Sequence, residues 1–375
     1  MAKVSSEVRI WEHEYECLDR EAMTRLQVAR LREAVARAYE RVPFYRKKFD
    51  EAGVRPEQIR SLDDLRRLPF TTKEELQADQ EAHPPFGSYV CSHPSTWYRV
   101  FTTSGTTGRP LRRVLSYRDW ELCMRWGMRR SLDAGGPERS IIAFLHLTEG
   151  FFGPTAGVES AARRGAMILS LGRYSSEQKV RLIHEYQPTT VSGTTSYLLY
   201  LGRLAEEIGM PFRNLRSLRV VTGGWDPGLV FEETRARMRE FWGDVSIVEA
   251  YGLTEICGLG GSCPYSPAIH VCGDLAILEV IDPETGEPVP PGEPGELVYT
   301  MLIGDTQPLL RYRSRDLGRL VPEPVCECGA SHPRLAFGIE GRVDDMIKYR
   351  GVNIYPAAVE KVVHGIPEIT DEFQI

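Results

Sequence analysis

Features that would place this chain in a membrane, on a nucleic acid or in an oxidising compartment are missing from its sequence. In 375 residues no apolar run reaches the roughly 20 residues of a membrane-spanning helix, and the residues after Met1 are charged, unlike a signal peptide. The net charge of −6 offers no basic surface for nucleic acid or anionic lipid. The 8 cysteines are irregularly spaced, unlike a disulfide framework. These absences predict a globular protein of the cytoplasm, with no nucleic-acid or membrane partner.

The first part of the chain has a helical pattern, over residues 20–85. Apolar residues recur there every three or four positions, and Pro43 is expected to end one helix. Thr72 and Glu75 have the spacing of a capping box, which predicts the start of another helix.

From about residue 100 onward, short apolar runs alternate with helical stretches. The expected strands are SIIAFLH (140–146), GAMILSL (165–171), PTTVSG (188–193) and LRVVTGG (218–224), and the expected helices are 117–133, 175–186, 195–209 and 227–243. This alternation is typical of an α/β domain with a largely parallel sheet. We expect a large domain over 1–341 that includes a β-rich part at 265–335, and then the start of a smaller domain over 342–375.

The stretch FTTSGTTGRP, residues 101–110, contains five hydroxyl-bearing residues and two glycines. Backbone amides in such a turn form a concave anion site, because small side chains let a phosphate approach the main chain. The Gly-Lys-Ser/Thr ending of the P-loop is missing. The residues expected to bind phosphate are Ser104, Gly105, Thr106, Thr107 and Gly108. An ordinary surface turn is the alternative.

Further motifs follow this loop in order: RVVTGGWDP, VEAYGLTE, RYRSRDLG and GIEGRVDDMIKYRG. Together they resemble the adenylate-forming superfamily of acyl-CoA synthetases, peptide-synthetase adenylation domains and luciferases. ARAYERVPFYRKKFDEAGV, SLDDLRRLPFTTKEEL and CECGASHPR resemble its phenylacetate–CoA ligase branch in particular. The resemblance covers nearly the whole chain from about residue 20. It implies a large N-terminal α/β domain with mostly parallel sheets flanked by helices, and a small C-terminal α+β domain.

The resemblance implies that a carboxylate oxygen attacks the α-phosphate of ATP, expels pyrophosphate and forms an acyl-adenylate, which then passes to coenzyme A. Because both reactants are anionic, the barrier is mainly electrostatic and positional. Thr106, Glu255 and Arg342 would act at the reacting phosphate, with Mg²⁺ on Glu255. The remaining implied nucleotide-binding residues are Gly223, Gly224, Trp225, Ala250, Tyr251, Gly252, Thr254 and Asp316.

Individual roles follow from this resemblance. Tyr251 would stack on adenine, and Asp316 would accept both ribose hydroxyls through one carboxylate. Asp344 matches the hinge about which the small domain swings. From the residues alone, the alternatives are a surface acid for Glu255, a core tyrosine for Tyr251, and for Asp316 a salt bridge with Arg313 or Arg315.

The acid pocket would be an aryl slot formed by LHLTEGFFGPTAG and GLGG. Phe151 and Gly153 fit a flat ring, and Gly258 would form another wall. Core packing is the alternative for Phe152. Glu149 departs from the branch, which usually has an uncharged residue there, and we expect it to meet an amino or hydroxyl substituent on the ring.

A second metal is predicted from cysteine and histidine spacing. Cys326 and Cys328 lie on one tight turn, and Cys263 and His270 flank a loop that leads into a strand. Two such pairs would form a structural Cys₃His zinc site. Reduced residues without a metal are the alternative, and Cys257, Cys272 and His332 are rival ligands.

The expected function is therefore ATP-dependent activation of an aryl carboxylic acid and its transfer to coenzyme A, by a chain that is a possible homodimer. Transfer of the adenylate to an amine, and nucleotide binding without turnover, are the alternatives. The segment ITDEFQI, which ends the sequence, reads as a strand that has just begun. We expect the family's small domain, with a lysine that reaches the α-phosphate, to continue beyond it, so that the 375 residues alone adenylate slowly and form no thioester.

Overall fold

The structure is a computed structural model. It describes residues 12–103, 110–130, 140–147, 150–224, 229, 231–258, 260–263, 265–322, 325–336, 338–344, 347–349, 352–354 and 359. The helices are α1 (His13–Glu16), α2 (Arg20–Arg41), α3 (Pro43–Glu51), α4 (Lys73–Ala82), α5 (Tyr117–Arg130), α6 (Phe152–Arg163), α7 (Ser176–Tyr186), α8 (Thr195–Glu207) and α9 (Glu232–Trp242). The strands are β1 (Trp97–Thr102), β2 (Arg112–Ser116), β3 (Ile141–Phe144), β4 (Met167–Ser170), β5 (Thr190–Ser192), β6 (Val220–Gly224), β7 (Ser246–Tyr251), β8 (Gly260–Cys263), β9 (Ser266–Val271), β10 (Ala276–Ile281), β11 (Gly295–Met301), β12 (Tyr312–Gly318), β13 (Arg334–Leu335), β14 (Gly341–Arg342), β15 (Ile347–Tyr349) and β16 (Val352–Ile354).

The N-terminal helices form as their sequence predicts. Helix α2 ends before Pro43, which then occupies the first turn of α3, where its missing N–H is not needed. Thr72 caps α4: its hydroxyl accepts from the backbone N–H of Glu75 at 3.3 Å, and its own N–H donates to the Glu75 carboxylate at 2.8 Å. The expected capping box is therefore confirmed. These helices share one buried apolar core with strands β10–β12.

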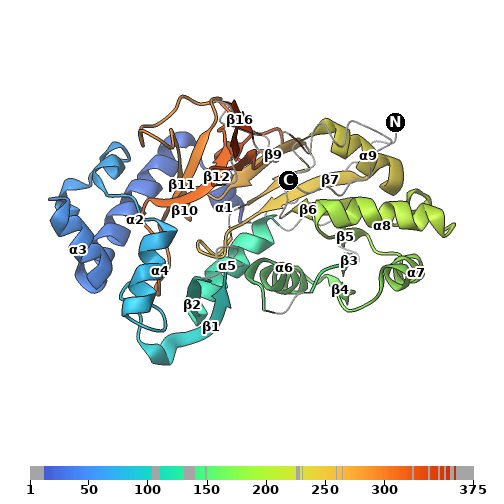
Figure 1. The fold of residues 1–375 in the computed structure, drawn as a ribbon, viewed down its shortest axis with the longest axis horizontal. Helices are drawn as coiled ribbons and strands as arrows, with labels where there is room; N and C mark the ends of the chain where they lie inside the picture. Colours follow the sequence, from blue (N-terminus) through green and yellow to red (C-terminus); the bar gives the residue numbers. More distant parts are fainter. Residues whose placement is uncertain are drawn as a thin grey trace.

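The large central sheet has eight strands in the order β13-β9-β8-β7-β6-β5-β3-β4. Strands β4, β3, β5, β6 and β7 run parallel, and β8, β9 and β13 continue the sheet antiparallel. The four apolar runs expected as strands are β3 to β6, so the predicted α/β class and its mostly parallel sheet are confirmed. Figure 1 shows this sheet running through the molecule with helices beside it.

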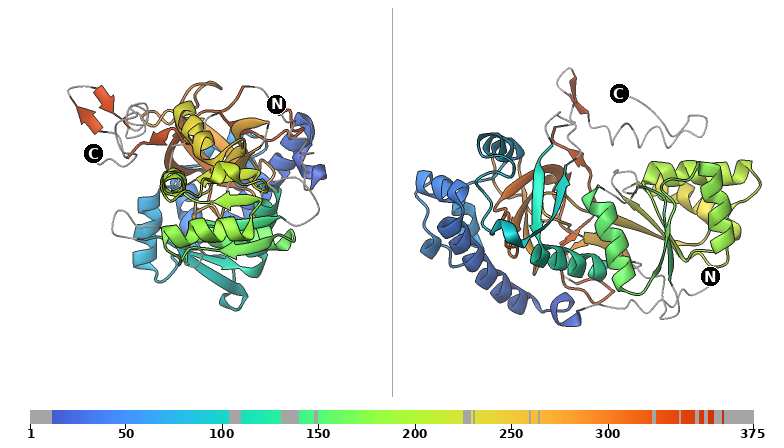
Figure 2. Two further views of the ribbon diagram at one scale, coloured as in Figure 1. Left: turned by 90° about the vertical axis from the view of Figure 1, so that its right-hand side faces the viewer. Right: turned by 90° about the horizontal axis from the view of Figure 1, so that it is seen from below.

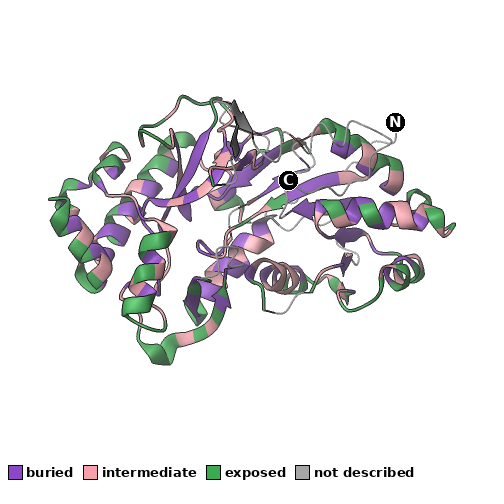
Figure 3. Cartoon of the chain, in the orientation of Figure 1, coloured by how far each residue is buried: buried purple, intermediate pink, exposed green. Residues whose placement is uncertain are grey.

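The two faces of the sheet bury different side chains, because successive residues of a strand point to opposite faces. Val191 and Val221 belong to a core that includes residues of α7, α8 and α9. Ile142 and Phe144 face the other way, toward Ala161 of α6. The strands are mainly buried, whereas the helices expose their outer faces (Figure 3). The sheet is thus covered by helices on both faces.

A smaller antiparallel sheet, in the order β10-β11-β12-β14, lies beside the large one. It accounts for most of the β-rich part expected at 265–335, but β9 and β13 belong to the large sheet instead. Beyond β14, the hairpin β15–β16 stands away from the body of the molecule (Figure 2). Among the described residues, no helix combines the length and apolar character needed to cross a bilayer.

Candidate active site

A cavity of about 650 Å³ lies between the large sheet and the helices that cover one of its faces. Its sheet side includes residues of β3, β5, β6 and β7, and its helix side includes residues of α5 and α6. At one end it reaches the loop that follows β7, with Tyr251, Gly252, Thr254 and Glu255, and also Arg342. That end lies at the carboxyl edge of the parallel strands, where ligands bind in open α/β sheets. We call it the mouth of the cavity.

The strands that lead to the mouth approach each other too closely for side chains. Gly224, at the end of β6, is in register with Ala250 of β7. A Cβ on Gly224 would lie 2.6 Å from the carbonyl oxygen of Ala250, so an alanine requires the backbone to move. A Cβ on Gly223 would lie 2.6 Å from the Leu229 side chain. Gly224 therefore has a structural reason to be glycine, whereas the contact at Gly223 is with the end of a flexible side chain that can move.

Asp316 is held in a buried, charged arrangement at the mouth. The Tyr251 hydroxyl donates to its Oδ2 at 2.5 Å, and Arg342 Nη1 donates to its Oδ1 at 2.8 Å. Burial raises the Asp316 pKa to about 6, although Arg342 and Tyr251 oppose that rise. Asp316 pairs with neither Arg313 nor Arg315, which contact Glu296 and Glu74 instead, so that alternative was wrong.

Glu255 is also buried, with 5% of its surface exposed, so the surface-acid alternative was wrong. The Tyr312 hydroxyl donates to its Oε1 at 3.1 Å. Lys73 Nζ, from the first turn of α4, lies 3.5 Å from the same oxygen. Lys73 lines the cavity together with Glu255. The carboxylate of Glu255, which offers hard oxygen atoms to a metal, and the flexible cation of Lys73 thus lie together where an anionic substrate would enter.

The residues expected to form the acid pocket border the same cavity. Phe151, Gly153 and Gly258 all line it, although the Phe151 side chain is 53% exposed. Phe152 also lines it, yet it is buried against Phe101, with ring centroids 5.4 Å apart. Phe152 therefore belongs to the core and to the cavity wall at once.

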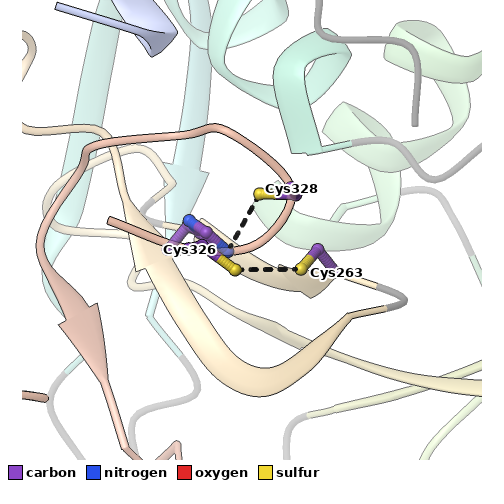
Figure 4. Close-up of side chains that lie close together, drawn as sticks. Cys263, Cys326 and Cys328 are labelled. Carbon is purple, nitrogen blue, oxygen red and sulfur yellow. Dashed lines mark hydrogen bonds between the residues drawn. The ribbon is translucent and has the colours of Figure 1, made fainter. Parts of the chain in front are cut away.

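The four predicted zinc ligands come together from two strands, β8 and β9, and the turn at 326–328. The ligand atoms of Cys263, His270, Cys326 and Cys328 all lie within 4.8 Å of one another. Cys263 Sγ is 3.7 Å from Cys326 Sγ, and Cys328 Sγ is 3.8 Å from His270 Nε2. Figure 4 shows the three cysteine side chains pointing toward a common centre.

The rival ligands lie elsewhere. Cys272 and His332 form a separate buried group with Glu16. There His332 Nε2 lies 3.1 Å from the Glu16 carboxylate, and His332 Nδ1 accepts from the backbone N–H of Gly273 at 3.2 Å. Both ring nitrogens thus have hydrogen-bond partners, and this group needs no metal. Cys257 lines the cavity.

Several predicted site residues lie outside the described residues: Ser104, Gly105, Thr106, Thr107, Gly108, Glu149 and Trp225. Conversely, sequence reasoning missed Lys73 and Tyr312. Lys73 lies 182 positions before Glu255 and follows an unremarkable helix cap, so no local signal connected the two. The available signal for Tyr312 was the alternation of arginine with other residues in YRSR, since alternate residues of β12, Tyr312 and Asp316 among them, are buried on one face.

Comparison with known proteins gives a consistent match. The AMP-binding enzyme family model matches residues 22–301. Phenylacetate-coenzyme A ligase of Thermus thermophilus is 38% identical over 98% of this chain and 80% of its own. The Escherichia coli enzyme of the same name is 33% identical over 93% of this chain and 78% of its own. A crystal structure of 2-hydroxyisobutyryl-CoA ligase, in the postadenylation state with 2-HIB-AMP, has a TM-score of 0.89 at 28% identity, covering 99% of this chain and 78% of that one.

Proposed function

The chain belongs to the AMP-binding enzyme family, and from that premise we propose that it is a phenylacetate-type, AMP-forming CoA ligase. It activates a carboxylic acid with ATP and transfers the acyl group to coenzyme A. The observation that carries the proposal is the mouth of the cavity. At the mouth, Asp316 is buried and paired with a tyrosine, and Glu255 is buried beside a lysine. Both acids open onto a largely apolar slot.

The first step joins two anions. A carboxylate oxygen of the acid forms a bond to the α-phosphorus of ATP while the bond from that phosphorus to the pyrophosphate oxygen breaks. No proton moves, so the protein has only to position the reactants and offset their charge. In the second step the sulfur of coenzyme A bonds to the acyl carbon, AMP leaves, and the thiol proton passes to solvent.

The described residues divide this work by their chemistry. The ionised Asp316 carboxylate has enough acceptor sites for two ribose hydroxyls in addition to its protein donors. Arg342 and Lys73 are cations that offset phosphate charge. Glu255 fits Mg²⁺, because its buried carboxylate offers the hard oxygen ligand that this ion prefers. When bound, Mg²⁺ would neutralise charge on the phosphates. Ser104 to Gly108 remain the expected phosphate loop, and Asp344 the expected hinge.

We also propose that Cys263, His270, Cys326 and Cys328 hold a structural zinc ion. A tetrahedral zinc with bonds of about 2.3 Å to sulfur separates two sulfur ligands by roughly 3.8 Å. The 3.7 Å between Cys263 Sγ and Cys326 Sγ agrees with that separation, and Cys328 Sγ lies 3.8 Å from His270 Nε2. Four protein ligands leave no open position, so the zinc would tie the Cys326–Cys328 turn to β8 and β9 and take no part in the reaction.

The function is tested by acid-dependent pyrophosphate release. Phenylacetate, benzoate and a short aliphatic acid are compared with ATP and Mg²⁺ present, and thioester is measured by mass spectrometry after coenzyme A is added. We expect release with the aryl acids, a loss of about 10²–10³-fold in Glu255→Gln, and little change in Glu284→Gln, an exposed acid on a distant turn. ATP binding without release from any acid would support the non-catalytic alternative. Capture of the adenylate by an amine would support amide formation, whereas thioester formed with coenzyme A would support the ligase and contradict the expectation that these 375 residues form none.

A further inference from the structure

The cavity continues below the mouth along one face of the large sheet. Phe144, Ser192, Thr222 and Val248 are neighbours in one row across β3, β5, β6 and β7. All four line the cavity. Val248 precedes Ala250, at the mouth, by two residues. At about 3.3 Å per residue, this row lies roughly 7 Å below the level of Ala250 along the strands.

A second row, two residues further down the strands, forms the lower end of the cavity. Ile142, which is in register with Thr190, lines the cavity there. By the same rise per residue, this row lies roughly 13 Å below the level of Ala250. Ile142 belongs to one buried apolar cluster with Phe144 and with Ala161 of α6, and Ala161 lines the cavity as well. The lower end is therefore apolar and far from the groups at the mouth.

Helix α6 gives a second measure of the same depth. It connects β3 with the parallel strand β4, so it runs back from the mouth toward the lower end. A rise of 1.5 Å per residue places Ala161 roughly 13 Å below Phe152, which lines the cavity at the start of the helix. The helix residues between these two that line the cavity are all small: Gly153, Pro154, Ala156, Gly157 and Ser160. The helix and the sheet thus enclose a slot whose two walls have the same length.

Phenylacetate is too short for this slot. With carbon–carbon bonds of about 1.5 Å, it extends roughly 5 to 6 Å from its carboxylate carbon to its far ring carbon. Carbon atoms in contact lie about 4 Å apart, so a tail of roughly 9 Å can extend below a carboxylate at the level of Ala250 before it meets Ile142. Phenylacetate would leave the last 3 Å or so of that length unfilled, whereas protein interiors keep few voids larger than a water molecule.

From this arrangement we propose that the acid has an unbranched apolar tail about 9 Å long, two or three methylene groups longer than that of phenylacetate. Its chemical class is an ω-phenylalkanoic acid of the length of 4-phenylbutyrate or 5-phenylpentanoate. Each methylene up to that length is buried in the slot, and each one beyond it meets the side chain of Ile142. The inference rests on the proposed function, because it places the carboxylate at the mouth. It deepens that function by naming the length of acid that the enzyme selects.

The test measures how activity depends on the length of the acid. Acid-dependent pyrophosphate release gives kcat/KM for the series from phenylacetate to 7-phenylheptanoate, and calorimetry with AMP present gives the affinity of each acid. We expect kcat/KM to rise about fourfold with each methylene, to a maximum at 4-phenylbutyrate or 5-phenylpentanoate. It should then fall about tenfold or more as the tail is forced against the lower wall. Straight-chain acids should reach their maximum near octanoate, because about eight carbons span the same length.

Substitutions at the lower wall should move the maximum in opposite directions. Ile142→Ala removes carbon atoms from this wall, so its maximum should lie one or two methylenes further along the series. Ile142→Phe adds bulk there, so its maximum should lie at a shorter acid. Val191→Ala is the matched control, because Val191 is buried on the opposite face of the same sheet and does not border the cavity. It should leave the position of the maximum unchanged.

The parent protein decides the proposal even if a variant does not fold. A maximum at phenylacetate, or activity that still rises at 7-phenylheptanoate, overturns this inference but leaves the proposed function standing. A folded Ile142→Ala whose maximum coincides with that of the parent, or a Val191→Ala whose maximum moves as far as that of Ile142→Ala, overturns it as well. Activation of no acid at all overturns both the inference and the proposed function.

Discussion

Ribose binding should depend on pH through Asp316, because only the ionised carboxylate accepts two hydroxyl protons at once. Burial raises the pKa of this group to about 6, against the opposing effects of Arg342 and Tyr251. With that pKa, about 99% of the group is ionised at pH 8 and about 9% at pH 5. The affinity for a ribose should therefore fall about elevenfold between these pH values.

The ligand must not titrate in the same range. A phosphate group has a second pKa near 6, so AMP would confuse the measurement. Adenosine keeps the ribose and carries no phosphate, and 2′-deoxyadenosine lacks one of the two hydroxyls. Calorimetric titration of each ligand at pH 5, 6, 7 and 8 should give a steep dependence for adenosine and a weaker one for the deoxynucleoside.

The matched variant is Asp316→Asn, which has nearly the same shape and does not titrate. It should bind adenosine more weakly than the parent at pH 8, by about 10–100-fold, because a charged acceptor is lost. Its affinity should be the same from pH 5 to pH 8. A parent affinity that does not change with pH would refute the raised pKa. A pH dependence that persists in Asp316→Asn would show that another group titrates, and would remove Asp316 from the ribose site.

The raised pKa of Asp316 also affects the stability of the fold. The fold favours the protonated acid, whereas the proposed ribose binding needs the ionised one. Because the folded pKa is above the value of 3.8, the fold favours the protonated acid. The stabilisation is complete below pH 3.8 and is lost as the pH rises through about 6, a difference of about 3 kcal/mol. The free energy of unfolding of Asp316→Asn, measured with denaturant, should therefore increase relative to that of the parent as the pH rises from 4 to 8. Ionisation of Asp316, which the proposed ribose site requires, thus destabilises the fold.

Four further outcomes are expected. Lys73→Met should lower kcat/KM for ATP about 10–100-fold without changing the melting temperature by more than a few degrees, because Lys73 offsets charge at the exposed mouth. Gly224→Ala should destabilise the protein by about 1–3 kcal/mol, because its Cβ would lie 2.6 Å from a backbone oxygen. Gly157→Ala should not, because its Cβ would make an ordinary 3.6 Å contact. Thermal unfolding of the two variants measures the difference. Protein that has never met a chelator should contain one zinc per chain by elemental analysis, and Cys328→Ser should contain much less; an absence of zinc from the parent would contradict the site. Removal of zinc by a chelator should lower the melting temperature but leave the Mg²⁺ requirement that we propose for Glu255 unchanged once Mg²⁺ is restored.

The strands of the large sheet were predictable because their burial on both faces requires continuous apolar runs. Val221 belongs to such a run, whereas Val191 is the one apolar residue of β5. The hairpin β1–β2 was not predicted, because WYRVFT mixes exposed and buried residues and precedes a loop whose composition suggested only a ligand. Helix α6 was also missed. Its first turn contains Phe152, Gly153 and Pro154, which read locally as a pocket loop. The packing of Ala161 against the sheet, which stabilises the helix, is not visible in the sequence.

The candidate site divides in the same way. Tyr251, Glu255 and Asp316 stand in motifs, so their residue types and their order along the chain are enough to indicate a shared role. Their actual partners could not be read from the sequence, because Lys73 reaches Glu255 from a helix that is distant along the chain.

Arg342 joins two carboxylates with one rigid group. Its Nη1 donates to Asp316, while Nε and Nη2 donate to the two oxygens of Asp344 at 2.9 Å and 3.0 Å. A guanidinium is planar, so these bonds fix the two acids relative to each other. A ribose that donates hydrogen bonds to Asp316 would alter the free energy of this arrangement. By thermodynamic reciprocity, any movement at Asp344 alters the affinity for the ribose by the same factor. With the proposed ribose on Asp316 and the proposed hinge at Asp344, nucleotide binding and hinge movement would therefore be coupled through a single side chain.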